Sequence, residues 1–196
     1  MKTPFRSLAL LLAMSGSVLL ADDVEDAIQA ALTAYKAGKA VEAGDLLKKA
    51  GDLIDEKTGN SLSAVLPDMI GDFKGGRITT KDLDGVGGGK ATERNYRKGD
   101  KEDPKSITAS VSVIANSPTL NQISTFLANP ALGALLGAKP KSVGGNTAMF
   151  IGKEGLLQMS VGGKFLVTVR GKKCSEDQLA QLAGGVNLDM LAKLAK

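Results

Sequence analysis

The sequence predicts an α+β fold, in which an N-terminal αα-hairpin precedes an antiparallel β-sheet with helices packed on it. Three observations predict this fold. Apolar residues recur at helical spacing in residues 22–60, they alternate with polar residues in 107–115, and two apolar runs flank a glycine pair in 156–170. We therefore expect a helical hairpin at 22–60 and an α+β sandwich domain at 61–196.

Residues 1–21 have the anatomy of a secretory signal peptide. A charged start with Lys2 and Arg6 precedes an apolar run, and small residues follow. Cleavage is expected near Ala21, with Ser17 as a second possible cleavage point. The alternative is a retained membrane anchor, but the apolar stretch from Ser7 to Ala21 is shorter than the about 20 residues that a spanning helix needs. The mature protein is therefore expected in the periplasm or outside the cell.

The composition excludes several kinds of chemistry. The 196 residues include no His and one Cys, which excludes a histidine base, a His-ligated metal, an internal disulfide and a thiolate zinc site. The formal net charge of +4 falls to +2 when Lys2 and Arg6 leave with the signal segment, and the remaining basic residues are interspersed with acidic ones. Nucleic-acid binding needs a concentrated basic face. We therefore expect no cofactor, no metal and no nucleic-acid partner.

Two helices are expected in the hairpin. Asp22 or Asp23 caps the first, and Gly38 ends it. Its apolar face is expected to hold Val24, Ala27, Ile28, Ala31, Leu32 and Tyr35. The apolar face of the second helix is expected to hold Leu46, Leu47, Ala50, Leu53 and Ile54. Small residues would let the two helices approach closely, in particular Ala34, Ala43 and Ala50.

Strands are expected from Arg77 onward, two of them flanking the glycines of residues 85–92 (GVGGGKAT). The clearest strand, 107–115, is expected to bury Ile107, Ala109, Val111, Val113 and Ala115. Residues 147–151 form a short buried strand, and two more strands meet at the Gly162-Gly163 turn. Strands joined in this way by hairpins are typical of an antiparallel sheet.

The turn between the last two strands fixes how they pair. A two-residue loop at 162–163 would place their apolar residues on opposite faces of the sheet. A three-residue loop at 162–164 makes one face uniformly apolar, and burial selects that register. The expected cross-strand pairs are Val161–Phe165, Met159–Val167 and Leu157–Val169.

Three further helical segments are expected. The first lies within 119–137, where Pro130 interrupts or kinks it. The second begins after Ser175, with Gln178 in the position of a capping box. Asn187 caps the last short helix.

The glycines of GVGGGKAT match a phosphate-binding loop only in part. Asp84 occupies the first glycine position of a Walker loop, and Ala91 occupies its hydroxyl position. A strand rather than a helix follows, so no helix N-terminus is available to hold a phosphate. We interpret the glycines as the tip of a β-hairpin.

Cys174 is the candidate reactive thiol. Lys172, Lys173 and the helix that begins at Ser175 would lower its pKa. However, no His or second Cys is available to complete a catalytic or redox pair. A half-buried or capped structural thiol is the preferred interpretation, with pairing between two molecules as an alternative.

Two charged clusters have alternative interpretations. The acidic residues within 100–103 suggest calcium or a two-carboxylate hydrolase, but they lack EF-hand spacing, and a solvated turn is preferred. The Tyr-Arg-Lys sequence at 96–98 suggests anion binding, and a strand edge kept soluble by charge explains it equally well.

Residues 119–138 carry no charge and form the candidate contact segment. Pro130 and Gly133 break the segment, so that it is not expected to span a bilayer. Either it packs across the sheet as a core helix, or part of it is an exposed apolar lip for a lipid, a hydrophobic ligand or a partner. The candidate ligand- or partner-binding residues are Leu120, Phe126, Leu132, Leu135 and Leu136.

The stretches GGGKATERNYRKGD, SITASVSVIANSPTL, FLANP, VGGKFLVTVRG and VNLDMLAKL are similar to a family of uncharacterised secreted bacterial proteins. That family pairs an N-terminal helical hairpin with an α+β domain. The second domain resembles PsbP-like domains, which are antiparallel sheets sandwiched by helices and serve mostly as non-catalytic accessory or binding modules. The resemblance covers most of the mature chain, but it rests on turns and strands and implies no catalytic residue.

These observations favour a non-enzymatic periplasmic binding or accessory protein. It would act through protein contacts made by the hairpin, or by holding a small hydrophobic ligand between the sheet and residues 120–136. One alternative is an envelope enzyme that uses carboxylates or Cys174. Another is a module that contacts lipid or a membrane surface through residues 132–136.

Overall fold

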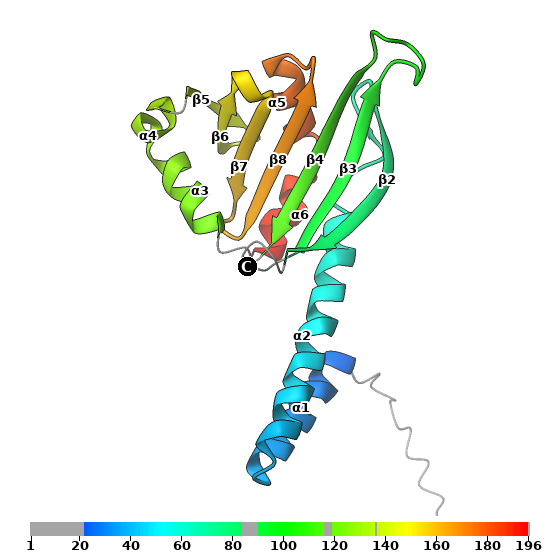
Figure 1. The fold of residues 1–196 in the computed structure, drawn as a ribbon, viewed down its shortest axis with the longest axis vertical. Helices are drawn as coiled ribbons and strands as arrows, with labels where there is room; N and C mark the ends of the chain where they lie inside the picture. Colours follow the sequence, from blue (N-terminus) through cyan, green and yellow to red (C-terminus); the bar gives the residue numbers. More distant parts are fainter. Residues whose placement is uncertain (1–21, 84–89, 116–118, 136, 196) are drawn as a thin grey trace, which may run out of the picture. The chain divides into compact units, whose positions relative to one another are not determined.

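The computed structural model describes residues 22–83, 90–115, 119–135 and 137–195. These residues form two N-terminal helices, an eight-stranded antiparallel sheet and further helices (Figure 1). The predicted α+β fold class is therefore confirmed. The chain divides into two compact units, one ending at residue 53 and the other beginning at residue 54.

The first unit is an αα-hairpin. Helix α1 spans Asp23–Lys36, and helix α2 spans Ala40–Ser63, of which the part up to Leu53 belongs to this unit. The Asp22 side chain caps α1 by accepting a backbone hydrogen bond at 3.0 Å. Gly38 has a φ of 76°, which lets the chain turn sharply between the helices. The predicted caps of the first helix are confirmed.

Alanines form the interior of this hairpin. Among the described residues of the unit, every buried side chain is an alanine: Ala27, Ala31, Ala34, Ala43 and Ala50. The expectation that Ile28, Leu32 and Tyr35 share the packed face is wrong, because all three are exposed. The same holds for Leu47 in α2, which is also exposed. Small side chains let two helices approach closely, so the alanine stripe faces inward and the larger residues beside it remain outside.

The second unit is built on one sheet with the strand order β1-β2-β3-β4-β8-β7-β6-β5, every neighbouring pair being antiparallel. Strands β1 to β4 and β5 to β8 form two meanders, which join where β4 pairs with β8. The strands are Met69–Ile70, Phe73–Asp82, Lys90–Lys98, Ile107–Ala115, Ala138–Val143, Asn146–Ile151, Leu156–Val161 and Phe165–Lys172.

Three features of this sheet differ from the sequence-based expectation. Strand β2 begins at Phe73 rather than Arg77, and the short strand β1 pairs with its first residues. Strand β5 was not expected, because its sequence AKPKSV combines two lysines with Pro140. It lies at the edge of the sheet, where charge and a residue without an N–H donor are tolerated.

The two most specific strand predictions are confirmed. Strand β4 buries Ala109, Val111, Val113 and Ala115, and Ile107 is partly buried. Strands β7 and β8 pair through the three-residue loop, because Gly162 and Gly163 both have positive φ. Their register contains the pairs Val161–Phe165, Met159–Val167 and Leu157–Val169.

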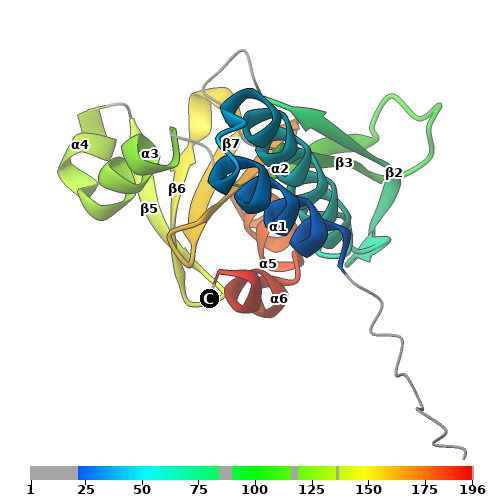
Figure 2. The same ribbon diagram turned by 90° about the horizontal axis from the view of Figure 1, so that it is seen from below.

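Helices cover both faces of the sheet (Figures 1 and 2). The main core contains buried residues of α5 and α6, which span Glu176–Gly184 and Leu188–Leu194. Helices α3 (Thr119–Ala128) and α4 (Pro130–Leu135) belong to the opposite face. Strand β6 shows the division, because Ala148 and Phe150 join the main core while Met149 and Ile151 pack with α3.

The helix boundaries follow the predicted signals. The break between α3 and α4 falls at Asn129, directly before Pro130, which begins α4. Ser175 and Gln178 form a complete capping box at α5, with hydrogen bonds of 2.9 and 3.2 Å. The Asn187 side chain caps α6 by accepting from the Met190 N–H at 3.0 Å. These local signals therefore fix where the helices start.

Candidate functional site

The inner side of the α3–α4 segment is held by the sheet. Leu127 packs with Ala138 and Met149 in a small cluster, to which Ile123 and Ile151 also contribute. Leu120 is 4% exposed. Leu120 is therefore not available for a contact with a ligand or partner. A contact surface can include only the other candidate residues.

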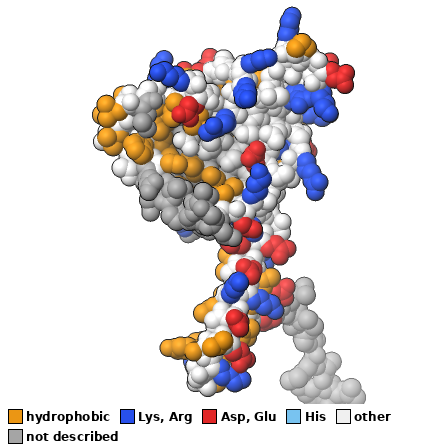
Figure 3. Space-filling model, in the orientation of Figure 1, with side chains coloured by type: hydrophobic (Ala, Val, Ile, Leu, Met, Phe, Trp, Pro, Cys, Tyr) orange, Lys and Arg blue, Asp and Glu red, His pale blue; other side chains and the backbone are white. Residues whose placement is uncertain are grey.

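The outer side of the same segment is an exposed apolar surface. Leu135 is 83% exposed, Phe126 is 36% exposed and Leu132 is partly exposed. We call these three residues the apolar lip. Figure 3 shows hydrophobic side chains gathered over α3 and α4. Leu136, the fifth candidate residue, lies outside the described residues.

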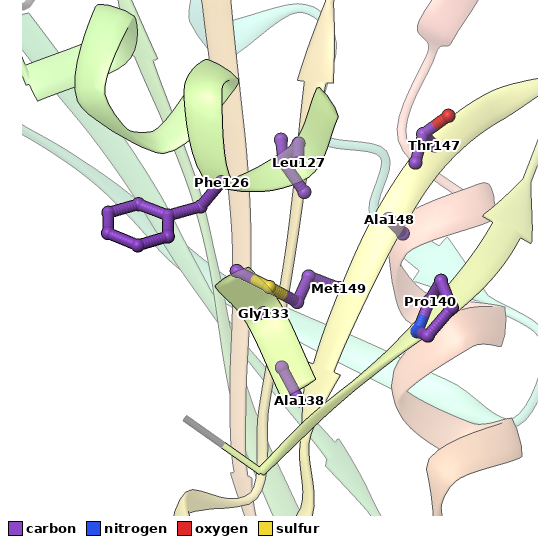
Figure 4. A pocket seen from close by; sticks show the side chains of 8 residues that line it. All are labelled: Phe126, Leu127, Gly133, Ala138, Pro140, Thr147, Ala148 and Met149. Carbon is purple, nitrogen blue, oxygen red and sulfur yellow. The ribbon is translucent and has the colours of Figure 1, made fainter. Parts of the chain in front are cut away.

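A pocket beside the apolar lip is almost filled. Its lining comprises Phe126, Leu127, Gly133, Ala138, Pro140, Thr147, Ala148 and Met149 (Figure 4). In Figure 4 the Phe126 ring points away from the other side chains, whereas Met149 reaches toward Gly133. The cavity volume is about 10 Å³, which is room for about one water molecule. Pockets for small organic ligands are usually about 300–1,000 Å³, so this arrangement favours contact at the surface over capture inside.

The glycine stretch at 85–92 lies mostly outside the described residues, which resume at Lys90. On either side of it β2 and β3 pair as a hairpin, with Asp82 opposite Lys90. Lys90 Nζ lies 3.3 Å from Asp82 Oδ1. The expected strand after the glycines is therefore confirmed, while the hairpin tip itself stays a prediction.

The two charged clusters serve turns and strands. In 100–103, Asp103 accepts a backbone hydrogen bond from Lys105 at 2.8 Å within the turn that joins β3 to β4. In 96–98, Tyr96 is buried in the core, and Lys98 pairs with Asp72 at 2.8 Å. Tyr96 and Lys98 therefore have partners of their own, whereas Arg97 lines an open groove together with Lys74 and Lys101. Within the described ranges, no three Cys, Asp or Glu side chains gather around a common point that could hold a metal ion.

Cys174 lies between the end of β8 and the start of α5. It is partly buried against the main core, and its Sγ lies 3.8 Å from the Thr108 carbonyl oxygen. The neighbouring Lys173 donates instead to the Pro104 carbonyl oxygen at 3.0 Å. Burial raises the pKa of the Cys174 thiol, in the direction opposite to an activated thiolate. The geometry therefore agrees with the preferred structural interpretation.

We expect Cys174 in the folded protein to react with a thiol reagent more slowly than a small free thiol near neutral pH. A raised pKa leaves a smaller thiolate fraction at that pH, and the thiolate is the reacting species. The rate should be measured against pH with a coloured disulfide reagent, using the urea-unfolded protein as the control. A folded-state rate above that of the free thiol would contradict the assignment and restore the enzyme alternative.

The sequence interpretation missed one buried polar network. Arg94, on the core face of β3, donates from Nη1 to the Leu66 carbonyl oxygen and from Nε to the Gly76 carbonyl oxygen, both at 2.8 Å. It also forms an ion pair with Asp68. Two positions along the strand, the Tyr96 hydroxyl donates to the carbonyl oxygen of Pro67 at 2.8 Å. Burial raises the pKa of Tyr96 to about 12, so the phenol remains a donor.

This network ties the segment after α2 to the middle of β3, and all its partners apart from Asp68 are backbone carbonyls. It supports the fold, because the Arg94 guanidinium and the Tyr96 hydroxyl are both occupied by hydrogen bonds within the protein. The inward positions of β3 are occupied by Thr, Arg and Tyr, which give no apolar alternation. The hydropathy pattern therefore did not predict that this face of β3 is buried.

The comparisons with known proteins found no matching family model, no matching curated protein and no matching solved structure. The resemblance to a secreted family with a PsbP-like domain therefore stays a prediction. In the part of the chain that the structure describes, none of the helices has the length and apolar character needed to cross a membrane.

Proposed function

We propose that this chain is a non-enzymatic accessory protein that binds a partner protein through the apolar lip. The observation that carries the proposal is the division of the α3–α4 segment. One side packs on the sheet through Leu127, while Leu135 on the other side is 83% exposed. Burying a leucine side chain in a core would stabilise the fold by about 1.5–3 kcal/mol, and this stabilisation is absent while Leu135 is exposed. An apolar surface on a segment seated in this way is typical of an interaction site.

Protein is favoured over the other two classes of partner. The cavity of about 10 Å³ leaves no room for a small hydrophobic ligand in its present form. Helices that lie on lipid surfaces usually carry Lys or Arg on their polar side, and residues 119–138 contain no charged residue at all. The apolar lip is uncharged, so it is better suited to an apolar patch on a partner protein than to the surface of an anionic membrane.

The N-terminal pattern supports a site of action outside the cytoplasm. The charged start, the apolar run and the small residues before Ala21 are those of an exported protein. We therefore propose that the partner is an envelope or secreted protein. Comparing the N-terminal residue of the protein isolated from its own cells with that of the unprocessed chain tests the export step.

The contact is tested by placing a photo-crosslinking amino acid at position 135 in cells that make the protein. We expect a discrete crosslinked protein band that disappears when a Phe126→Asp change is added, because a charge at the lip would have to be desolvated on binding. The matched control is the same amino acid at Met69, which is also exposed and lies on β1, away from the lip in the sheet order. Crosslinks to lipid, or equal protein bands from both positions, would overturn the proposal.

A further inference from the structure

The helical hairpin of the first unit carries more large apolar side chains outside than inside. Its buried side chains are all alanines within the described residues. By contrast Ile28, Leu32, Tyr35 and Leu47 are between 43% and 70% exposed. Domains below about 40 residues rarely bury enough apolar surface to be stable without a further contact. The unit therefore has the composition of half a bundle.

The exposed apolar residues of both helices lie on the same side of the hairpin. Ile28, Leu32 and Tyr35 each follow a buried alanine, which places them about 100° round α1 from the inward stripe. In α2, Gly44 and Gly51 likewise follow the buried Ala43 and Ala50. The two helices run in opposite directions, so the residue that follows a buried alanine lies on the same side of the hairpin in both helices. We call this side the outer face; it consists of Ile28, Leu32, Tyr35, Gly44, Leu47 and Gly51.

The outer face has both projections and gaps. Leu47 stands between Gly44 and Gly51 along α2, and a Cβ at either glycine would meet no atom within 4 Å. Large side chains of a facing helix can enter such gaps, as they do in helical bundles. Figure 3 shows hydrophobic side chains along this hairpin. The surface is therefore suited to another pair of helices rather than to a flat partner.

The charges beside the outer face indicate which pair of helices binds to it. Glu25 lies near the start of α1 and Lys36 at its end, on the same edge of the apolar stripe. An antiparallel second copy would bring Glu25 against Lys36 of the second copy at both ends of α1. In a parallel two-fold arrangement α1 would lie opposite α2 of the second copy, and this pairing of Glu25 with Lys36 would be lost. The hairpin is thus complementary to itself in one orientation, as a two-fold symmetric interface requires.

We propose that the outer face binds the outer face of a second, antiparallel copy of this chain, so that two hairpins form a four-helix bundle. This proposal is independent of the apolar lip, which lies in the other unit. Two joined copies carry two lips, so a partner with repeated sites would be held more tightly than by either lip alone.

Sedimentation equilibrium of the purified protein over a wide concentration range tests the proposal. We expect a mass twice that of one chain at high concentration. Leu32→Asp should weaken self-association by about tenfold or more, because each dimer then buries two carboxylates in place of two leucines. Ala30→Asp is the matched control, since it adds the same charge to the same helix at an exposed position on the side opposite the outer face and should leave the association unchanged.

Exchanging the two charges distinguishes binding of a second copy from binding of any other partner. Glu25→Lys and Lys36→Glu should each weaken self-association, and the double variant should restore it. Circular dichroism verifies that every variant keeps its helices. A monomer at all concentrations, or a dimer that tolerates Leu32→Asp, would overturn the proposal. Leu135→Asp should leave the mass unchanged, so failure of the lip and failure of the hairpin interface are distinguishable.

Discussion

Arg94→Ala is expected to destabilise the sheet domain by about 3–5 kcal/mol. The side chain is 9% exposed and makes charged hydrogen bonds to the carbonyl oxygens of Leu66 and Gly76. Each hydrogen bond to a charged group contributes about 1.5–3 kcal/mol, and a buried carbonyl left unpaired adds its own desolvation cost. The measurement is equilibrium urea unfolding followed by circular dichroism.

The ion pair with Asp68 is expected to contribute little to this loss. The Asp68 side chain is 89% exposed, so its carboxylate is well hydrated without Arg94. Asp68→Asn should therefore cost about 1 kcal/mol or less. Arg97→Ala is a further control, since Arg97 lies on the other face of the same strand and should change stability by about 0.5 kcal/mol or less. If Asp68→Asn cost as much as Arg94→Ala, the carbonyl hydrogen bonds would not be the source of the stability.

Arg94 also shows why part of the fold could not be predicted from the sequence. Strand β4 alternates apolar and polar residues, and β7 and β8 share an apolar face in only one register, so local pattern sufficed for both. The inward residues of β3 are Thr92, Arg94 and Tyr96, which no hydropathy pattern marks as a core face. Arg94 and Tyr96 donate to the carbonyl oxygens of Leu66 and Pro67, which lie 28 and 29 residues earlier in the chain, and this relation appears only after folding.

The two apolar surfaces illustrate the same limit for the site. The sequence identified residues 119–138 and left open whether they pack or project. The structure shows both, with Leu120 covered and Leu135 exposed. In α1 the prediction was wrong because Ala31 and Leu32 lie on neighbouring stripes of similar apolar character. Periodicity finds the apolar side of a helix to within about one residue, and only the close approach of a second helix decides that the smaller residue faces inward.

Gly155→Ala is expected to destabilise the protein by about 2–4 kcal/mol. Gly155 has a φ of 58°, and a left-handed conformation costs a residue with a Cβ about 1–2 kcal/mol. A Cβ there would also lie 2.4 Å from the carbonyl oxygen of Gly171, a backbone atom that cannot move without disturbing β8. The Gly171 N–H donates to the Gly155 carbonyl oxygen at 2.9 Å, so the same shift would strain a hydrogen bond.

Gly163→Ala separates the two causes, because Gly163 has nearly the same backbone angle with open space around it. Its φ is 68°, and a Cβ there would meet no atom within 4 Å. This variant should lose only the conformational part, about 1–2 kcal/mol. The difference between the two free energies of unfolding then measures the close approach of the 155 turn to β8. Equal losses would show that backbone conformation alone accounts for the glycine, and that β8 accommodates a methyl group at this point.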